Sequence, residues 1–170
     1  VALISELTNF SLDAIGRIVS FTFLALCLVP ARSITKNLRL PDSVFYVFTA
    51  LLFSSPLYLY YSRTFMMETT AVFFCITAIK YFIDLIQSKL SLKYSILFLI
   101  FITLGILQKV TTALPVLAIL GIAYCFFEYK KENSVIKNLL SKEIILAGVY
   151  FGIPLMIGAI WTFYTDHVKL

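Results

Sequence analysis

The strongest constraint on this chain is the apolar stretch from Tyr94 to Phe127, which runs for 34 residues and contains a single charged residue, Lys109. An α-helix rises about 1.5 Å per residue, so one unbroken helix of this length would be about 51 Å long. The hydrocarbon core of a bilayer is only about 30 Å thick. We therefore expect two membrane helices, 94–107 and 113–127, with a break around Lys109.

The composition of the whole chain agrees with a membrane protein. It is 61% hydrophobic and 14% charged, whereas soluble domains are about 45–50% apolar and about 25% charged. There is too little polar surface to cover a water-soluble globule, so we predict an integral membrane protein. The net charge of +5 is then a property of membrane topology, and we expect no nucleic-acid partner.

About 20 apolar residues are needed to cross a bilayer as a helix, and the hydropathy pattern supplies six such segments. Residues 1–13 mix apolar and polar side chains in a way that suits a helix lying on the membrane surface. The predicted fold is an all-α, polytopic transmembrane helical bundle that forms one domain over residues 1–170. The six predicted segments are 15–31, 43–61, 69–86, 94–107, 113–127 and 144–164.

Glycine and proline residues indicate where these segments break, bend and pack. Pro115 suits the first turn of the helix after the break, where a backbone N–H has no partner in any case. Gly148 and Gly152 place two small residues on one face of the last segment, which favours close helix packing. Pro154 is expected to kink the same segment.

Lysine and arginine residues are divided unequally between the two sets of loops. Cytoplasmic loops carry the excess of positive charge, so the richer set is predicted to be cytoplasmic. The N-terminus then lies outside, and we expect at least one span before Val1, so that the chain is an internal piece of a longer protein. The richer set holds nine cations: Arg32, Lys36, Arg39, Lys89, Lys93, Lys130, Lys131, Lys137 and Lys142. The outer set holds four: Arg17, Arg63, Lys109 and Lys169.

Charges on the outer side are the candidates for chemistry. Arg63 and Glu68 are the only charged residues between Ser43 and Ile79, and charges at the junction of two membrane segments are costly. Arginine and lysine can bind a lipid phosphate through charge-assisted hydrogen bonds. A carboxylate beside them can hold a divalent cation or orient an acceptor hydroxyl.

A purely structural interpretation of the same residues stays open. Glu68 would favour the dipole of the helix that it begins, and Arg63 and Lys109 would extend to the membrane surface. Tyr61 would belong to an aromatic belt. His167, next to Asp166, suggests a metal ligand or a base, although a single histidine at an exposed end usually has neither role.

Four sequence elements follow one another along the chain. They are Gly16-Arg17, the turn from Pro56 through Tyr61-Ser62-Arg63 to Glu68, a Phe-rich helix, and the turn from Gly105 through Lys109 to Pro115. Their order and spacing resemble the GT-C superfamily of membrane glycosyltransferases. The chain is most similar to the protein O-mannosyltransferase and lipid A aminoarabinose-transferase branch, and the resemblance covers most of residues 15–127. It departs from that branch in two places, because Glu68 stands where aspartate is more usual and Val110-Thr111 replaces the usual Gly-Pro.

The resemblance implies an enzyme that transfers a sugar from a polyprenyl-phosphate carrier to an acceptor glycan, lipid or protein. It implies that Arg63 and Lys109 bind the lipid phosphate, and that Glu68 is a supporting carboxylate or ligand of a divalent metal. Minor contributions would come from Tyr61, Arg17, Thr111 and His167.

The catalytic base of such enzymes lies in a first outer loop. The resemblance therefore implies that the base and the first helix precede this chain, that a further part follows it, and that the chain alone is inactive. The enzyme would work on the outer face of the cytoplasmic membrane of a bacterium or archaeon. Two alternatives stay open: a transporter or flippase domain, and a structural membrane subunit without chemistry.

Overall fold

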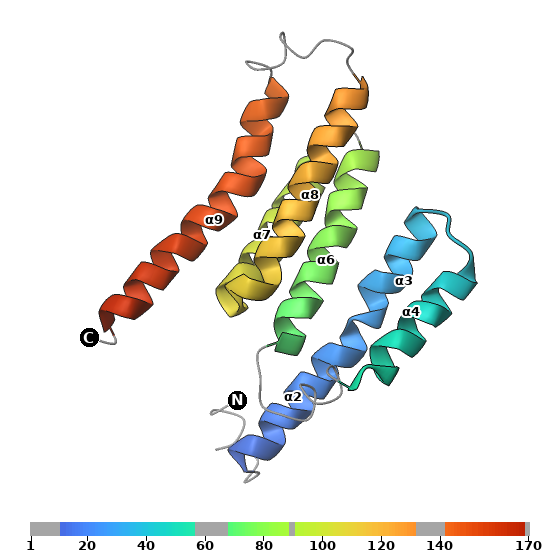
Figure 1. Ribbon diagram of the computed structural model, residues 1–170, viewed down its shortest axis with the longest axis vertical. Coiled ribbons are helices and arrows are strands. Elements are labelled where there is room, and N and C mark those ends of the chain that lie inside the picture. Colours follow the sequence, from blue (N-terminus) through green and yellow to red (C-terminus); the bar gives the residue numbers. More distant parts are fainter. Residues whose placement is uncertain (1–10, 57–67, 89–90, 132–141, 169–170) are drawn as a thin grey trace.

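The computed structural model of the chain describes residues 11–56, 68–88, 91–131 and 142–168. Within these ranges 92% of the residues are helical and there is no strand, which confirms the predicted all-α class. Figure 1 shows the helices running alternately up and down along the long axis. They are α2 (Leu12–Leu26), α3 (Leu28–Asn37), α4 (Asp42–Ser54), α6 (Glu68–Gln87), α7 (Leu92–Gln108), α8 (Val110–Lys131) and α9 (Lys142–Val168).

Three of these helical stretches are long and apolar enough to cross a membrane. They are 13–37, in which α2 and α3 follow one another, 68–87, and 148–168. Three shorter apolar helices, at 42–54, 92–108 and 110–126, fall below that length. The structure thus confirms a helix within each of the six predicted segments and membrane-spanning length at three of them. Two predicted ends differ: α4 ends at Ser54 and residues 57–61 lie outside the described residues, while α3 continues to Asn37 through residues expected in a loop. The predicted surface helix falls largely on residues 1–10, outside the described residues.

The long N-terminal stretch has a clear start and one irregular joint. The Ser11 side chain accepts a hydrogen bond from the Ala14 N–H at 3.3 Å and caps α2, as N-cap serines do. The helix therefore begins before the predicted residue 15. The joint between α2 and α3 lies at Cys27, three residues before Pro30. Proline has no N–H to donate to the carbonyl four residues back, which is Leu26, the last residue of α2.

The chain reverses after α3 through a tight turn. The Leu40 N–H donates to the Thr35 carbonyl at 2.9 Å, and the Arg39 N–H donates to the Lys36 carbonyl at 3.0 Å. This is the Schellman pattern, in which a left-handed residue ends a helix. Arg39 takes that position with a φ of 53°, although glycine is the usual residue there. The turn brings α4 back alongside α3, and α3 is the only described helix that α4 contacts.

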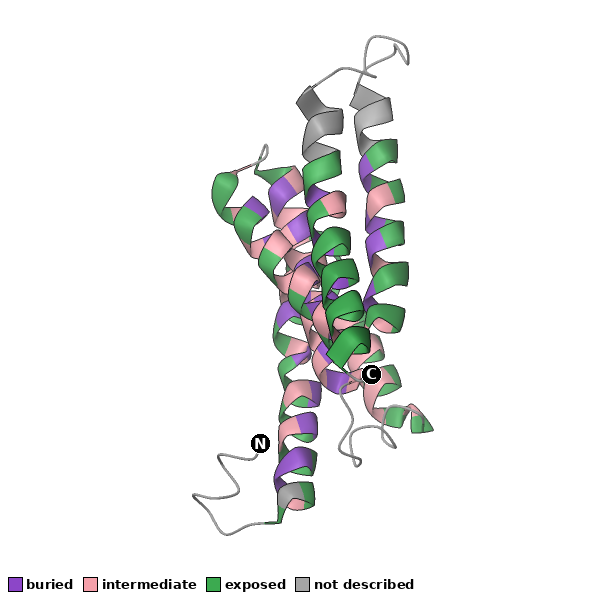
Figure 2. Cartoon of the chain, turned by 90° about the vertical axis from the view of Figure 1, so that its left-hand side faces the viewer, coloured by how far each residue is buried: buried purple, intermediate pink, exposed green. Residues whose placement is uncertain are grey.

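Helix α6 is the centre of the packing, because it contacts α2, α3, α7 and α8. Its Phe82 ring lies 5.5 Å from the Phe98 ring of α7, and Phe98 lies 6.2 Å from Tyr150 of α9. The Tyr150 hydroxyl and the Ser95 hydroxyl are buried and hydrogen-bonded at 2.7 Å. Figure 2 shows buried residues on the inner helix faces and exposed ones outside. Many of the exposed residues are apolar, such as Phe163 at 78% exposure, as expected for a lipid-facing surface.

Two sequence predictions about prolines and glycines are wrong in detail. The break after α7 is one residue, Lys109, so α8 begins at Val110 and Pro115 lies beyond its first turn. A Cβ atom added to Gly148 or Gly152 would meet no atom of the described residues within 4 Å, so these two glycines do not pack against a described helix. The glycine of α9 that packs closely is Gly158, where an added Cβ atom would lie 2.5 Å from Cγ2 of Ile106 on α7. Helix α9 continues through Pro154.

Gly105 gives a test of this packing. A Cβ added there would lie 3.3 Å from the Cys75 Sγ of α6 and 3.7 Å from the Ala113 Cβ of α8. We expect Gly105→Leu to destabilise the bundle by about 1–3 kcal/mol, because overpacking forces the helices apart. Gly148→Leu is the matched control and should cost little. Thermal unfolding in detergent micelles measures both, and equal effects would contradict the close contact.

Candidate functional site

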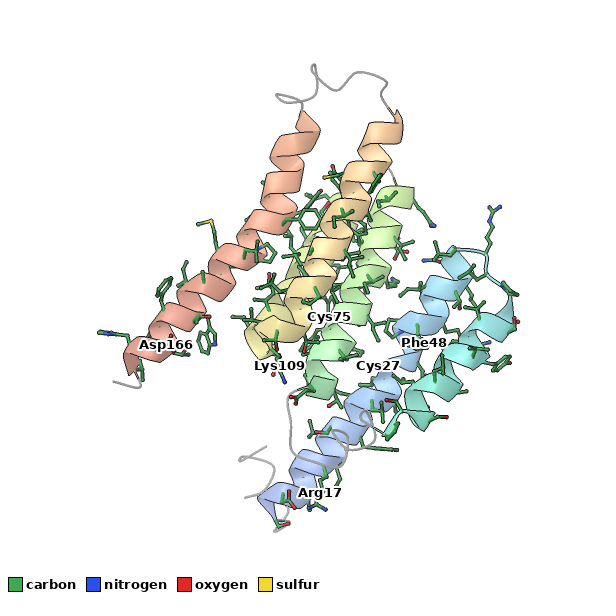
Figure 3. The ribbon with its side chains drawn as sticks, in the orientation of Figure 1. Arg17, Cys27, Phe48, Cys75, Lys109 and Asp166 are labelled. Atoms are coloured by element: carbon green, nitrogen blue, oxygen red, sulfur yellow. The ribbon has the colours of Figure 1, made fainter. Side chains whose placement is uncertain are left out.

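An ion pair joins the start of α6 to the link between α7 and α8. The Lys109 Nζ donates to the Glu68 Oε1, across 41 positions of sequence. The lysine side chain is 38% exposed and the glutamate side chain 19% exposed. The pair is therefore partly withdrawn from solvent but open on the lysine side. Figure 3 shows Lys109 near the lower end of α6, where Glu68 begins the helix.

The backbone around Lys109 explains why its side chain is held in place. Lys109 is extended (φ −158°, ψ 102°) and its N–H donates to the Gly105 carbonyl at 3.0 Å, which ends α7. Its carbonyl accepts from the N–H groups of Thr112 and Ala113 at 3.2 Å, which starts α8. One residue thus ends one helix and begins the next. The close approach at Gly105 brings this residue to α6.

Glu68 and Thr69 form the other half of the site. A carboxylate in the first turn of a helix is stabilised by the positive end of the helix dipole, so Glu68 is favoured here with or without Lys109. Thr69 is 0% exposed, and its Oγ1 has no hydrogen-bond partner among the described residues. A buried hydroxyl without a partner costs about 1–3 kcal/mol. This buried hydroxyl follows directly on the acidic residue of the pair.

The other predicted site residues divide into three groups. Arg63 and Tyr61 lie outside the described residues. Arg17 is exposed and pairs with Asp13 at 2.6 Å on α2, and Figure 3 shows it beyond Lys109 along the long axis. The structure therefore does not bring Arg17 to the Glu68–Lys109 pair.

Thr111 and His167 share the Lys109 end of the bundle without joining the pair. Thr111 is exposed in the first turn of α8. His167 is exposed in the last turn of α9, and its neighbour Asp166 lies apart from Lys109 in Figure 3. Sequence reasoning placed Glu68 and Lys109 on one side of the membrane but missed their direct contact. The feature of the sequence that could have indicated this contact is that both residues lie at the ends of apolar segments.

A divalent metal does not fit the described part of the site. Magnesium and calcium take several oxygen ligands, whereas Glu68 is a single carboxylate that already accepts from a lysine. The described residues contain no group of three or more histidine, cysteine, aspartate or glutamate side chains that could hold a metal ion. We therefore derive no step through a metal.

A second ion pair lies near the other end of α6. The Lys80 Nζ is 2.8 Å from the Asp84 Oδ2 and 4.0 Å from the centre of the Tyr81 ring. The Asn37 side chain donates to Asp84, and the Gln87 side chain donates to the Asn37 carbonyl at 3.1 Å. These bonds attach the end of α3 to α6. Both members of this pair have further partners, because Lys80 lies over the Tyr81 ring and Asp84 accepts from Asn37. The Lys80–Asp84 pair is therefore a suitable control for Glu68–Lys109.

Comparison with known proteins gives no match. This holds for protein-family models, for curated proteins and for solved structures. The chemistry of the site therefore rests on its geometry. A lysine ammonium has three donors, and Glu68 takes one of them. The other two have no partner among the described residues and could bind an anionic ligand, and the glutamate fixes the direction of the side chain.

The strength of the pair can be measured with a double-mutant cycle of Glu68→Gln and Lys109→Met. We expect a coupling of about 1 kcal/mol in unfolding free energy, because both side chains are partly withdrawn from water. The pair Asp13–Arg17 is the control, since its side chains are 61% and 59% exposed and its coupling should be smaller. A coupling for Glu68–Lys109 that does not exceed the control value would contradict this geometry.

Proposed function

We propose that the chain is the membrane part of a glycosyltransferase that moves a sugar from a polyprenyl-phosphate carrier to an acceptor glycan, lipid or protein. The observation that supports this most is the Glu68–Lys109 ion pair at one end of the bundle. It holds a lysine with two donors that have no partner among the described residues, and the segment that contains Arg63 directly precedes Glu68 in the sequence.

In such a transfer the bond between the sugar and the phosphate breaks, and negative charge grows on the phosphate. A fixed cation stabilises that charge in the transition state. Lys109 supplies the cation and Glu68 orients it. Arg63 adds a second cation, whose guanidinium can donate two parallel hydrogen bonds to the phosphate. The role proposed for these three residues is therefore to bind the carrier and to stabilise the charge on its phosphate.

The proposal includes a topology. The short helices α4, α7 and α8 also cross the membrane, so that six spans alternate in direction, as the ribbons in Figure 1 do. Glu68, Lys109 and the end of α9 then face the outer side. The ends of α3 and α6, with the larger number of cations, face the cytoplasm.

Binding of undecaprenyl phosphate to the chain in detergent micelles tests the site. A charge-assisted hydrogen bond contributes about 1.5–3 kcal/mol, so Lys109→Ala should weaken binding about tenfold or more. Arg63→Ala should weaken it similarly. In the complete protein both variants should insert normally and abolish transfer. Lys80→Ala is the control, since it removes the lysine of the other α6 ion pair. Wild-type binding by Lys109→Ala would sink the proposal.

One observation favours a transporter as the second candidate. Figure 3 places Lys109 at about the height of Cys27, and Cys27 lies near the middle of the 25-residue stretch 13–37. If that stretch is centred in the bilayer, the Glu68–Lys109 pair lies at mid-membrane. Ion pairs at that depth are typical of transport pathways.

The depth of the pair distinguishes the two candidates. Gln108→Cys is placed in a variant whose Cys27, Cys75 and Cys125 are alanine, and proteoliposomes are treated with a membrane-impermeant maleimide. The glycosyltransferase predicts reaction from one side only, and Ser88→Cys, at the other end of α6, should react from the opposite side. Protection of Gln108→Cys from both sides would favour the transporter.

A further inference from the structure

We propose that the groove between α3 and α4 binds an anionic phospholipid of the bilayer, with its headgroup phosphate on Arg32 and Lys36. This site lies toward the end of the bundle opposite the Glu68–Lys109 pair. It is independent of the function proposed above and uses none of the same residues.

The groove is a cavity of about 570 Å³ with two cations in its wall. Arg32 and Lys36 are one helical turn apart on α3, so their side chains share one face. The Arg32 guanidinium lies 5.5 Å from the centre of the Phe45 ring on α4. This is within the range of a cation–π interaction, which helps to orient the guanidinium. The cavity is lined by Leu28, Val29, Arg32, Ser33, Lys36 and Phe45.

The charge of the groove is not neutralised from within the described residues. Neither Arg32 nor Lys36 forms an ion pair there. Of the acids on the neighbouring elements, Asp84 is taken by Lys80 and Asn37, and Asp42 is exposed in the first turn of α4. Two adjacent cations without an acid are complementary to a phosphate.

A second, mostly apolar cavity shares part of the wall of the groove, which is the reason to choose a lipid over a soluble anion. A second cavity of about 380 Å³ also has Val29 and Ser33 in its wall. It extends to Leu26, which lies nearer the middle of the 13–37 stretch, and to Phe73 and Phe101. Its one lysine, Lys80, is already paired with Asp84. Charge near the helix end and apolar wall toward the middle match the headgroup and acyl chains of a membrane lipid.

The surroundings explain what such a lipid would do. Helix α4 has no buried residue and packs only against α3 among the described helices. Its attachment is therefore weak, and a lipid seated between α3 and α4 adds contacts to both. Basic pockets between membrane helices on the cytoplasmic side bind anionic headgroups, and the loop count assigns this end to the cytoplasm.

The test measures binding of phosphatidylglycerol to the purified chain in neutral detergent, by native mass spectrometry and by titration. Each cation near an anionic lipid contributes about fivefold in affinity, so Arg32→Ala with Lys36→Ala should weaken binding about twentyfivefold. The charge-matched control is Arg39→Gly with Lys93→Ala, which removes two exposed cations that do not line the cavity. It should bind nearly as the wild type does.

A third variant separates the groove from general surface charge. Val29 lines both cavities and is 69% exposed, so Val29→Trp fills the groove at constant charge while leaving the core intact. It should weaken phosphatidylglycerol binding at least fivefold. Circular dichroism is used to check that all variants keep their helix content.

Several results would overturn the proposal. These are wild-type affinity in the Arg32→Ala, Lys36→Ala variant, an equal loss in the charge-matched control, unchanged binding by Val29→Trp, and equal binding of phosphatidylcholine. Tighter binding of inorganic phosphate or of undecaprenyl phosphate at these residues would assign the groove to another ligand and would also overturn it.

Discussion

The structure depends on one constraint: a chain with this little polar surface must satisfy its backbone N–H and C=O groups by itself. In lipid there is no water to pair with them, and helices are the form in which one segment satisfies its own groups. The described residues are accordingly 92% helical. The same constraint shapes the links, because the Lys109 N–H and carbonyl are both used, one by α7 and the other by α8.

Sequence periodicity and composition predicted the all-α class and the approximate location of the described helices apart from α3, most of which was expected to be a loop. The break in the 94–127 stretch was predicted as well, but its length was not. The predicted helices 94–107 and 113–127 leave a break of five residues, 108–112, whereas the structure breaks at a single residue, Lys109. That outcome depends on Gly105 lying against Cys75 and Ala113, which is a tertiary contact that no local pattern reveals.

The same limit explains the outcomes at the candidate site. Alternating topology placed Glu68 and Lys109 on one side of the membrane, and the structure pairs them. Topology also grouped Arg17 with them, yet Arg17 has its own partner four residues away. Residues on the same side of the membrane can lie far apart along its surface, whereas the residues of a binding site must be in contact. The packing of α6 against α7 and α8 determines that Glu68 and Lys109 are the residues in contact.

The single-residue link at Lys109 has a mechanical consequence. Both backbone groups of Lys109 are engaged in helices, which restricts how α7 and α8 can move relative to one another. The ion pair between Lys109 and Glu68 adds α6 to this unit. Among the described helices α4 has the fewest neighbours, because it packs against α3 alone. The ion pair therefore lies in the firmly packed part of the bundle, and α4 is the described helix that is freest to move.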